Sequence, residues 1–385
     1  MNPHHSERPR VLFLFSDTGG GHRSAAEAII ESLELTYPGQ IQTEMVDIFR
    51  AAPPPLGLAI PTYPAMASMP AVWETTYKVS NGRRRARFIQ DAFWPYVRRA
   101  VYRVLEEHPA DLIVSVHPVP NRTFLRVITT KTPYITVVTD MVTTHAMWYD
   151  QRADLVVVPT EEALQRGLEM GLTSDQMQVV GLPVADRFCH NLGTRAELRA
   201  KLGWPLDKPV MLMLGGGEGM GPLGRTAVAV DEACLPATLA IITGRNVKLR
   251  AKLEKRKWKS PAFIYGFVRE MPLYMQAADV LVTKAGPGTI SEGFIAGLPL
   301  ILYSRMPGQE EGNVTYVVEK EAGVWAPEPE MVVDTLANWL SNPAELARVS
   351  RNSRSLGRPN SSRRIAEIIG QRVGMPIPTP TPLED

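Results

Sequence analysis

Short, continuous apolar runs recur along the whole chain, and longer, more polar stretches of helical character separate them. In the first half these runs lie at 11–15, 111–116, 134–139, 155–158 and 178–180, and in the second at 211–214, 239–243, 263–266, 280–282 and 300–303. Uninterrupted runs rich in Val, Ile and Leu are typical of strands buried on both faces of a parallel sheet. The pattern therefore predicts an α/β chain in which parallel strands alternate with helices.

The two groups of strands are separated by an irregular connection that begins at 181 and ends at 209. A chain of 385 residues is long enough for two domains of ordinary size. We expect a doubly wound N-terminal domain over 1–190 and a C-terminal one over 191–360. A final helix that crosses back to the first domain and a disordered Pro-rich tail should occupy 361–385.

Composition narrows the class of protein further. Charged residues make up 21% of the chain, hydrophobic residues 44%, and the net charge is only +2, which gives no reason to expect a nucleic-acid partner. The only two cysteines, Cys189 and Cys234, lack metal-ligand spacing, so a reducing compartment is expected. A polar N-terminus predicts no secretory signal, and no apolar run is long enough to span a bilayer. We therefore expect a cytoplasmic protein.

The stretch 279–313 carries the most specific pattern, because it reads as strand, Gly loop, helix and strand. Gly286, Gly288 and Thr289 lie where the helix begins, and Lys284 ends the preceding strand. Backbone N–H groups and the helix dipole at such a position can hold a phosphate. Glu292 could accept hydrogen bonds from a ribose diol. A second loop at the same sheet edge carries three polyol-binding candidates: Gln309, Glu310 and Asn313. Diphosphate, ribose and polyol together describe a nucleotide sugar, whereas the plainer interpretation is a βαβ unit with glycines for packing.

A second glycine cluster follows the strand at 211–214. Five of the seven residues from 215 to 221 are glycine, which packing alone does not explain, and Gly216, Gly217 and Gly219 are interpreted as a second phosphate nest. The strand at 239–243 ends beside Arg245, which we add to the donor-binding candidates.

In the first half, the strand at 11–15 leads into a glycine turn that delivers His22 to the start of a helix. At this turn the dinucleotide GxGxxG pattern lacks its third glycine, because Ser24 stands at that position, and no GxxxxGK[ST] motif is present. His117, Asp140 and His145 follow other predicted strands of the same domain, so they should meet His22 at the carboxyl edge of one sheet. Each of these residues alone could be an ordinary structural one. Their convergence makes them candidates for catalysis and acceptor binding.

Residues 51–73 are apolar, rich in proline and free of charge, and an arginine cluster that includes Arg83, Arg84 and Arg85 follows. The segment could be a loop packed on its own core and the arginines a solvated face. An apolar segment beside a basic cluster is also what peripheral binding to an anionic phospholipid membrane requires. We favour membrane contact.

Several of these motifs resemble one known family, the monogalactosyldiacylglycerol synthases, which are related to the lipid-II-forming N-acetylglucosaminyltransferase. The resemblance rests on the glycine turn with Gly20, Gly21 and His22, on the spacing of Asp140, His145 and Trp148, on GGGEGMGP at 215–222, and on 279–313.

It implies a GT-B fold, with two Rossmann-like domains facing each other across a cleft. It also implies a UDP-hexose donor, galactose favoured, with its uracil near Phe267, and 1,2-diacylglycerol as the acceptor near Gly20, Gly21, His117, His145 and Trp148.

For the chemistry we expect inversion to a β-glycoside, with His22 as the base and Asp140 as its orienter or substitute. No Asp-x-Asp sequence occurs, so we expect no metal, with the two Gly loops stabilising the leaving UDP. A peripheral position on the cytoplasmic face of a membrane is expected. Three alternatives stay open: UDP-glucose as donor, a GT-B-like UDP-sugar epimerase, and a non-enzymatic UDP-sugar sensor.

Overall fold

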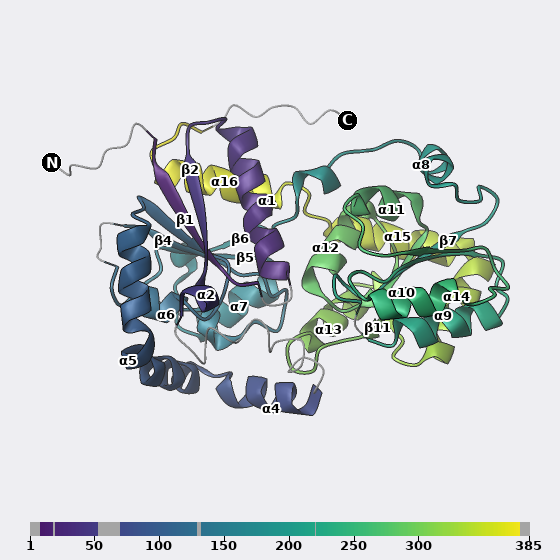
Figure 1. Ribbon diagram of the computed structural model, residues 1–385, viewed down its shortest axis with the longest axis horizontal. Coiled ribbons are helices and arrows are strands. Elements are labelled where there is room, and N and C mark those ends of the chain that lie inside the picture. Colours follow the sequence, from purple (N-terminus) through teal and green to yellow (C-terminus); the bar gives the residue numbers. More distant parts are fainter. Residues whose placement is uncertain (1–7, 18–19, 53–69, 129–131, 220, 378–385) are drawn as a thin grey trace. The chain divides into compact units, whose positions relative to one another are not determined.

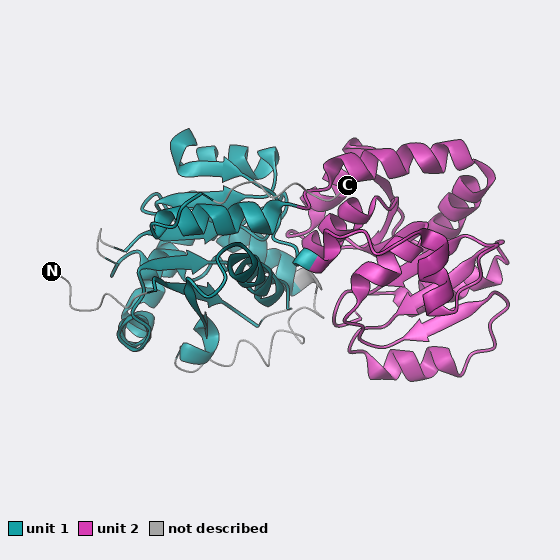
Figure 2. Ribbon diagram, turned by 90° about the horizontal axis from the view of Figure 1, so that it is seen from above, with its two compact units in different colours: residues 1–186, 360–385 teal, residues 187–359 magenta. Residues whose placement is uncertain are grey.

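The computed structural model describes residues 8–17, 20–52, 70–128, 132–219 and 221–377. The chain divides into two compact units (Figure 2). Unit 1 comprises Met1–Asp186 with Asn360–Asp385, and unit 2 comprises Arg187–Pro359. Most of the apolar segment at 51–73 lies outside the described residues, and so does the end of the Pro-rich tail.

Unit 1 is built on a sheet of six parallel strands in the order β2-β1-β3-β4-β5-β6. The strands are β1 (Arg10–Phe15), β2 (Gln42–Asp47), β3 (Leu112–Ser115), β4 (Tyr134–Val137), β5 (Leu155–Val158) and β6 (Met177–Val179). After β1 the chain first adds β2 on one side and then β3 on the other. The strand order therefore reverses at β1 and β3, the place where open α/β sheets bind ligands beyond the carboxyl ends of their strands.

Helices cover both faces of this sheet (Figure 1). The helices of unit 1 are α1 (Gly21–Thr36), α2 (Ile48–Ala51), α4 (Pro70–Ser80), α5 (Arg83–Glu107), α6 (Asn121–Phe124), α7 (Glu161–Glu169) and α16 (Ser361–Arg372). Val101 and Val104 of α5 pack on the face that carries Leu12 and Leu14. Helices α1 and α16 pack on the opposite face, so the last helix of the chain completes the core of unit 1.

Unit 2 repeats this architecture with a sheet in the order β12-β11-β10-β7-β8-β9, again all parallel. Its strands are β7 (Val210–Leu214), β8 (Thr238–Ile242), β9 (Ala262–Tyr265), β10 (Val280–Lys284), β11 (Leu300–Ser304) and β12 (Gly323–Trp325). Here the order reverses between β7 and β10. The two Gly loops that follow these strands are therefore neighbours at one sheet edge.

The helices of unit 2 are α8 (Arg195–Leu202), α9 (Leu223–Glu232), α10 (Val247–Glu254), α11 (Met271–Ala277), α12 (Pro287–Ala296), α13 (Glu311–Glu319), α14 (Pro329–Ser341) and α15 (Pro343–Leu356). Leu223 of α9 and Val332 of α14 belong to the core on one face of the sheet. Helix α12 lies on the other face, since a Cβ on its Gly293 would come within 3.0 Å of Leu281 and Leu300.

The predicted α/β class with two Rossmann-like parallel sheets is confirmed, and two strands were not expected. Strand β2 lies at the edge of the sheet and has only two apolar residues, Met45 and Val46, and only its last two residues, Val46 and Asp47, are buried. Strand β12 has 3 residues and lies at the other end of the second sheet's strand order, again at an edge. Edge strands lack the continuous apolar run that marks a central strand.

Candidate functional site

The first candidate site lies beyond the carboxyl ends of three neighbouring strands in unit 1. His22 is in the first turn of α1, directly after the loop that leaves β1. His117 follows β3, and Thr139 and Asp140 follow β4. The ring centroids of His22 and His117 are 4.5 Å apart, and those of His22 and Trp148 are 6.1 Å apart. The structure thus brings His117 into ring contact with His22, and the charge of Asp140 acts on His22.

Two hydrogen bonds determine which nitrogen of His22 is basic. Its Nδ1 lies 2.9 Å from the carbonyl oxygen of Val116 and 2.9 Å from Oγ1 of Thr139. Because a carbonyl oxygen can only accept, Nδ1 must carry the hydrogen in neutral imidazole. The lone pair therefore lies on Nε2, for which the described part of the chain supplies no hydrogen-bond partner. A proton acceptor is placed in this way at the sheet edge.

Burial favours the neutral form of this imidazole. It lowers the pKa of His22, and it does so more strongly than the charge of Asp140 and the hydrogen bond to Val116 raise it. Burial also holds the pKa of His117 well below its usual value, and the neighbouring His22 adds to that effect. His117 is a hydrogen-bond acceptor through Nδ1, to which the N–H of Val119 donates at 3.3 Å.

Asp140 is not the hydrogen-bonding orienter of His22 that the sequence suggested. Its Oδ2 accepts from the indole Nε1 of Trp148 at 2.7 Å, and it acts on His22 through its charge. The groups that orient the imidazole are the Val116 carbonyl and Thr139, which sequence reasoning missed. Trp148 is completely buried, so the prediction that it contacts an acceptor is wrong. Its role is to hold Asp140.

His145 is turned toward α4. Its Nδ1 accepts from the N–H of Met147 at 3.2 Å, and its Nε2 lies 3.1 Å from Oγ of Ser80. The ring also packs edge-on against Tyr77, whose hydroxyl donates to the carbonyl of Thr143 at 2.8 Å. Burial lowers the pKa of His145 to about 4, and Arg166 adds to the shift. In the structure, His145 joins α4 to the loop after β4.

The remaining acceptor and membrane candidates are at the surface. Apart from adjacent residues and the backbone of α1, no described atom lies within 4 Å of the position that a Cβ would take on Gly20 or Gly21. Arg83, Arg84 and Arg85 begin α5 and are exposed. Arg85 donates to the carbonyl of Asn81 at 3.0 Å, which fixes its direction.

The second candidate site lies in unit 2, where the loops after β7 and β8 interlock. A Cβ on Gly244 would come within 2.3 Å of the Gly217 carbonyl oxygen, and one on Gly219 within 2.1 Å of the Thr243 carbonyl oxygen. Both glycines also have positive φ, 58° and 61°. The N–H of Gly219 donates to the carbonyl oxygen of Gly216 at 3.1 Å. Its prediction as a phosphate ligand is therefore wrong, and Gly244, which sequence reasoning did not single out, is equally required.

Gly216 and Gly217 lie beside two basic side chains. A Cβ on Gly216 would meet the ε-carbon of Lys284 at 3.3 Å, and one on Gly217 would meet a guanidinium nitrogen of Arg245 at 3.7 Å. The Arg245 guanidinium stacks over the ring of Phe267 at 4.7 Å and pairs with Glu218 at 2.6 Å. Phe267 is 54% exposed, so an aromatic surface with an ordered cation borders the Gly loop.

The start of α12 supplies the second phosphate-binding feature. Gly286 is its N-cap and Pro287 its first residue, so helical geometry leaves the N–H groups of Gly288 and Thr289 without acceptors inside the helix. No described atom lies within 4 Å of a Cβ built on Gly288. Nζ of Lys284 is 3.1 Å from the corresponding position on Gly286. Two N–H groups, a helix dipole and an ammonium group thus share one open position.

Two of the polyol candidates, Glu310 and Asn313, are buried, and a Cβ on Gly286 would lie 3.8 Å from Oε1 of Glu310. Glu310 accepts from Lys284 at 2.5 Å and from the N–H of Met306 at 2.7 Å. Asn313 donates from Nδ2 to the Ala285 carbonyl at 2.9 Å, while its buried Oδ1 has no hydrogen-bond partner among the described residues. Gln309 precedes them in the same loop and is half-buried.

Glu292 lies in the second turn of α12. Burial raises the pKa of its carboxyl to about 8, although the charge of Arg187 opposes that shift. At neutral pH the group is therefore largely protonated, so it can donate a hydrogen bond as well as accept one. Such a perturbed carboxyl close to a phosphate-binding position is a mark of a functional site.

The fold and these sites define the chain as a two-domain protein of the GT-B glycosyltransferase class. The family model of monogalactosyldiacylglycerol (MGDG) synthase matches residues 22–184, and that of the glycosyltransferase family 28 C-terminal domain matches residues 210–366. A probable chloroplastic MGDG synthase of Glycine max is 36% identical over 389 residues, covering 96% of this chain and 73% of that protein. MGDG synthase 1 of Arabidopsis thaliana, also chloroplastic, is 34% identical, with 98% and 74% covered. The chain belongs to the monogalactosyldiacylglycerol synthase family.

Solved structures agree on the fold. The UDP complex of S. aureus MnaA aligns with a TM-score of 0.64 at 14% identity and covers 97% of this chain and 100% of that one. MurG of Acinetobacter baumannii aligns with a TM-score of 0.59 at 15% identity, with 94% and 99% covered. A UDP-GlcNAc 2-epimerase of Neisseria meningitidis aligns at 0.62 and 14% identity, with 94% and 100% covered. At these identities the likeness is one of fold, which transferases and epimerases share.

Proposed function

We propose that the chain transfers galactose from UDP-galactose to 1,2-diacylglycerol and inverts the anomeric centre to give a β-glycoside. Membership of the MGDG synthase family supports the donor and the acceptor. The roles that we assign to particular residues are supported by the geometry of the two candidate sites. One observation carries the chemistry: Nδ1 of His22 lies 2.9 Å from the Val116 carbonyl oxygen, which assigns the hydrogen of the neutral imidazole to Nδ1 and the lone pair to Nε2.

In this mechanism the acceptor hydroxyl attacks the anomeric carbon while the bond to the leaving diphosphate breaks. Nε2 of His22 takes the hydroxyl proton as the new bond forms. The imidazolium that results is stabilised by the hydrogen bond from Nδ1 to Val116 and by the charge of Asp140. A base that is neutral before the reaction and stabilised as a cation afterwards lowers the barrier to proton transfer.

The donor belongs in unit 2. We assign its diphosphate to the start of α12 and to Lys284, where N–H groups, the helix dipole and one cation can stabilise the charge that develops on UDP. This assignment requires no metal ion. The stacked pair of Arg245 and Phe267 borders the base, and Glu292 serves the ribose. The unsatisfied Oδ1 of Asn313 and the loop of Gln309 and Glu310 serve the hexose.

The outer face of α5 supports a further part of the proposal, peripheral binding to an anionic phospholipid membrane. Arg84, Phe88, Arg99 and Tyr102 are exposed at helical spacing on the side opposite the core, and Phe88 is 75% exposed. Aromatic rings insert at the membrane interface, while arginines contact anionic headgroups. None of the described helices is long and apolar enough to cross a bilayer.

We place the enzyme on the cytoplasmic face of a membrane. Cys189 and Cys234 are thiols rather than a disulfide, which supports a reducing compartment. This location is a proposal, since the similar plant proteins are chloroplastic.

The experiment that tests the activity is incubation with diacylglycerol and either UDP-galactose or UDP-glucose, followed by identification of the lipid and its anomeric configuration. β-Galactosyldiacylglycerol formed in the presence of EDTA is the expected product. A glucolipid would replace the proposed donor, and an α-linkage would exclude inversion. Loss of activity with EDTA would contradict the metal-free assignment. Conversion of the UDP-sugar to an epimer without any acceptor would favour the epimerase. The family comparison does not favour that alternative.

Membrane binding is tested by sedimentation with vesicles. The triple variant Arg83→Ala/Arg84→Ala/Arg85→Ala should bind anionic vesicles less than wild type does. The matched control Lys248→Ala/Lys252→Ala/Lys255→Ala removes the same charge from the exposed side of α10 and should bind as wild type. Equal binding of wild type to neutral and anionic vesicles would contradict the electrostatic part of the proposal.

A further inference from the structure

Four charged residues interact with one another after the carboxyl ends of β1 and β2, close to the start of the helix that carries His22. Arg23 donates to both carboxylate oxygens of Asp17, from Nε to Oδ1 and from Nη2 to Oδ2, the latter at 2.7 Å. Arg50 donates to Oδ2 of Asp17 at 3.2 Å. The N–H of Asp17 donates to Oδ2 of Asp47 at 3.3 Å. We call Asp17, Arg23, Arg50 and Asp47 the Asp17 network.

We propose that the Asp17 network positions the imidazole of His22 for proton transfer, and this inference rests on His22 being the base of the proposed function. Arg23 is the next residue after His22, in the first turn of α1. A fork-to-fork pair between Arg23 and Asp17 therefore closes the loop between β1 and α1 immediately beside His22. The guanidinium also stacks on the buried ring of Phe15, at the end of β1, at 4.7 Å. The start of α1 is thereby tied to the last residue of its own strand.

The same network reaches His22 along a second route. Asp47 caps the short helix α2, since its Oδ1 accepts from the N–H of Phe49 at 3.0 Å and from that of Arg50 at 3.3 Å. The ring of Phe49 packs edge-on against His117 with centroids 5.5 Å apart, and His117 packs in the same way against His22 at 4.5 Å. Asp47 thus joins a charged route through Asp17 and Arg23 to an aromatic route through Phe49 and His117.

The hydrogen bonds of Nδ1 and the Asp17 network act on different features of His22. Val116 and Thr139, at the ends of two other strands, determine the rotation of the ring through Nδ1. The Asp17 network determines where the backbone of His22 stands relative to those partners. A shift of the loop by less than an ångström would stretch the hydrogen bonds of Nδ1 and release the tautomer that keeps the lone pair on Nε2.

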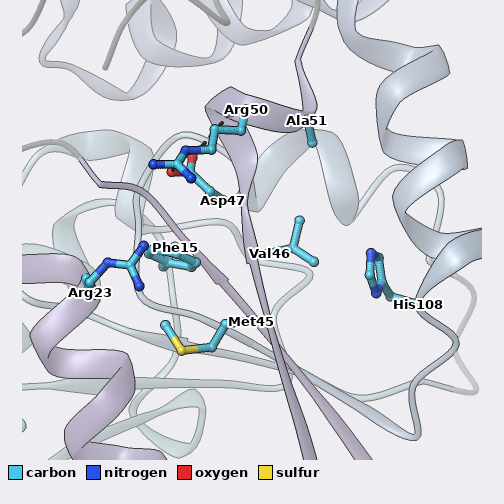
Figure 3. A pocket seen from close by; sticks show the side chains of 8 residues that line it. All are labelled: Phe15, Arg23, Met45, Val46, Asp47, Arg50, Ala51 and His108. Carbon is cyan, nitrogen blue, oxygen red and sulfur yellow. Dashed lines mark hydrogen bonds and ion pairs between the residues drawn. The ribbon is translucent and has the colours of Figure 1, made fainter. Parts of the chain in front are cut away.

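An open hollow of about 460 Å³ adjoins the network and makes it chemically accessible (Figure 3). Arg23, Asp47 and Arg50 line it together with Phe15 and Val46, and the two guanidinium groups extend from different elements, α1 and α2 (Figure 3). Removal of the Arg23 side chain would therefore leave a site that a guanidinium ion from solution can enter. That property permits a rescue experiment that a role in stability alone would not predict.

The first test uses Asp17→Asn, which keeps the shape of the side chain and removes its charge. We expect kcat to fall by about 10- to 100-fold, the effect of misplacing a catalytic group, while the KM for UDP-galactose stays within about twofold. Asp91→Asn is the matched control, because Asp91 accepts from Arg122 in the same two-pronged way at 2.7 and 2.8 Å. The control should lower Tm as Asp17→Asn does and leave kcat unchanged.

The second test is chemical rescue of Arg23→Ala by millimolar guanidinium chloride, well below denaturing concentrations. The ion should restore part of kcat in Arg23→Ala and nothing in His22→Ala. Unchanged kcat in Asp17→Asn, an equal loss in Asp91→Asn, or no rescue would each overturn the inference. An active His22→Ala variant would instead remove the proposed base, so failure of the positioning role and failure of the proposed function are distinguishable.

A measurement without turnover completes the test. In the wild-type chain the ring nitrogens of His22, assigned by comparison with His22→Gln, should give the NMR signature of the Nδ1–H tautomer. Asp17→Asn should show both tautomers, whereas Asp91→Asn should match wild type. A pure Nδ1–H tautomer in Asp17→Asn would show that the imidazole is positioned without the network and would overturn the inference.

Discussion

Replacing Lys284 by methionine should lower both the stability of unit 2 and its affinity for UDP, and a second substitution should separate the two effects. Lys284 ends β10, its ammonium group is 2.5 Å from Oε1 of Glu310, and its side chain lies between the Gly loops after β7 and β10. It is thus placed both to neutralise a buried carboxylate and to contact a diphosphate. Methionine has nearly the same length and no charge, so both interactions are lost while packing is kept.

The loss of stability follows from the burial of Glu310, which is 4% exposed. Removing one partner of a buried ion pair costs ~3–5 kcal/mol. Here the N–H of Met306 still donates to Glu310, and the side chain of Lys284 is 25% exposed, so a smaller cost is expected. We expect about 2 kcal/mol, which corresponds to a fall in Tm of roughly 4–8 °C for a domain of this size.

The loss of affinity follows from the charged contact to phosphate. Hydrogen bonds to a charged group contribute ~1.5–3 kcal/mol, so the Kd for UDP should rise by about 10- to 100-fold. Calorimetric unfolding and titration with UDP measure the two quantities separately. UDP is used rather than the UDP-hexose, so that any contact of Glu310 with the sugar does not enter.

The double variant Lys284→Met/Glu310→Gln provides the decisive comparison. Glutamine can still accept from the N–H of Met306 and leaves no buried charge, so Tm should return close to the wild-type value. The affinity for UDP should stay low, because nothing replaces the ammonium group. If the double variant recovered both quantities, or if Lys284→Met bound UDP as wild type does, Lys284 would be a structural partner of Glu310 and no phosphate ligand.

Three further predictions concern ionisable groups. His22→Ala should lower kcat by ~10²–10⁴-fold with UDP affinity kept. Because burial lowers the pKa of His22, the acid limb of the wild-type pH–rate profile should lie below 6.5. A limb above that value would contradict the assignment of His22 as the base. Burial raises the pKa of Glu292 from 4.5 to about 8, so the folded chain keeps a proton that the unfolded chain loses, and unfolding free energy falls as pH rises through this window. This loss of unfolding free energy is on the order of 3 kcal/mol, and Glu292→Gln should remove it and also weaken UDP binding. A gain in Tm that is independent of pH would refute the burial argument. His145 has the opposite sign: its pKa is lowered from 6.5 to about 4, so the unfolded chain binds more protons and stability falls as pH drops through that window. His145→Gln should flatten this acid slope, and an unchanged slope would exclude His145 as its source.

Periodicity was sufficient to predict the sheets and the positions of their loops. Continuous apolar runs identify central strands, and Gly-rich sequences after them identify the carboxyl edge where ligands bind. His22, Lys284 and the start of α12 could therefore be proposed as site candidates from sequence alone, and the family to which the chain belongs was recognised in the same way. Strands β2 and β12 were not predicted, because an edge strand needs no continuous apolar run.

The roles of particular side chains depended on contacts between residues far apart in sequence. The Val116 carbonyl, 94 positions from His22, determines which imidazole nitrogen is basic. The contact with Trp148 removes Asp140 as a hydrogen-bonding orienter, and the closeness of the Thr243 carbonyl reassigns Gly219 from ligand binding to packing. Sequence patterns report which face of an element is buried. Hydrogen-bond direction, tautomer and desolvation are properties of the assembled site, and only the tertiary structure decided them.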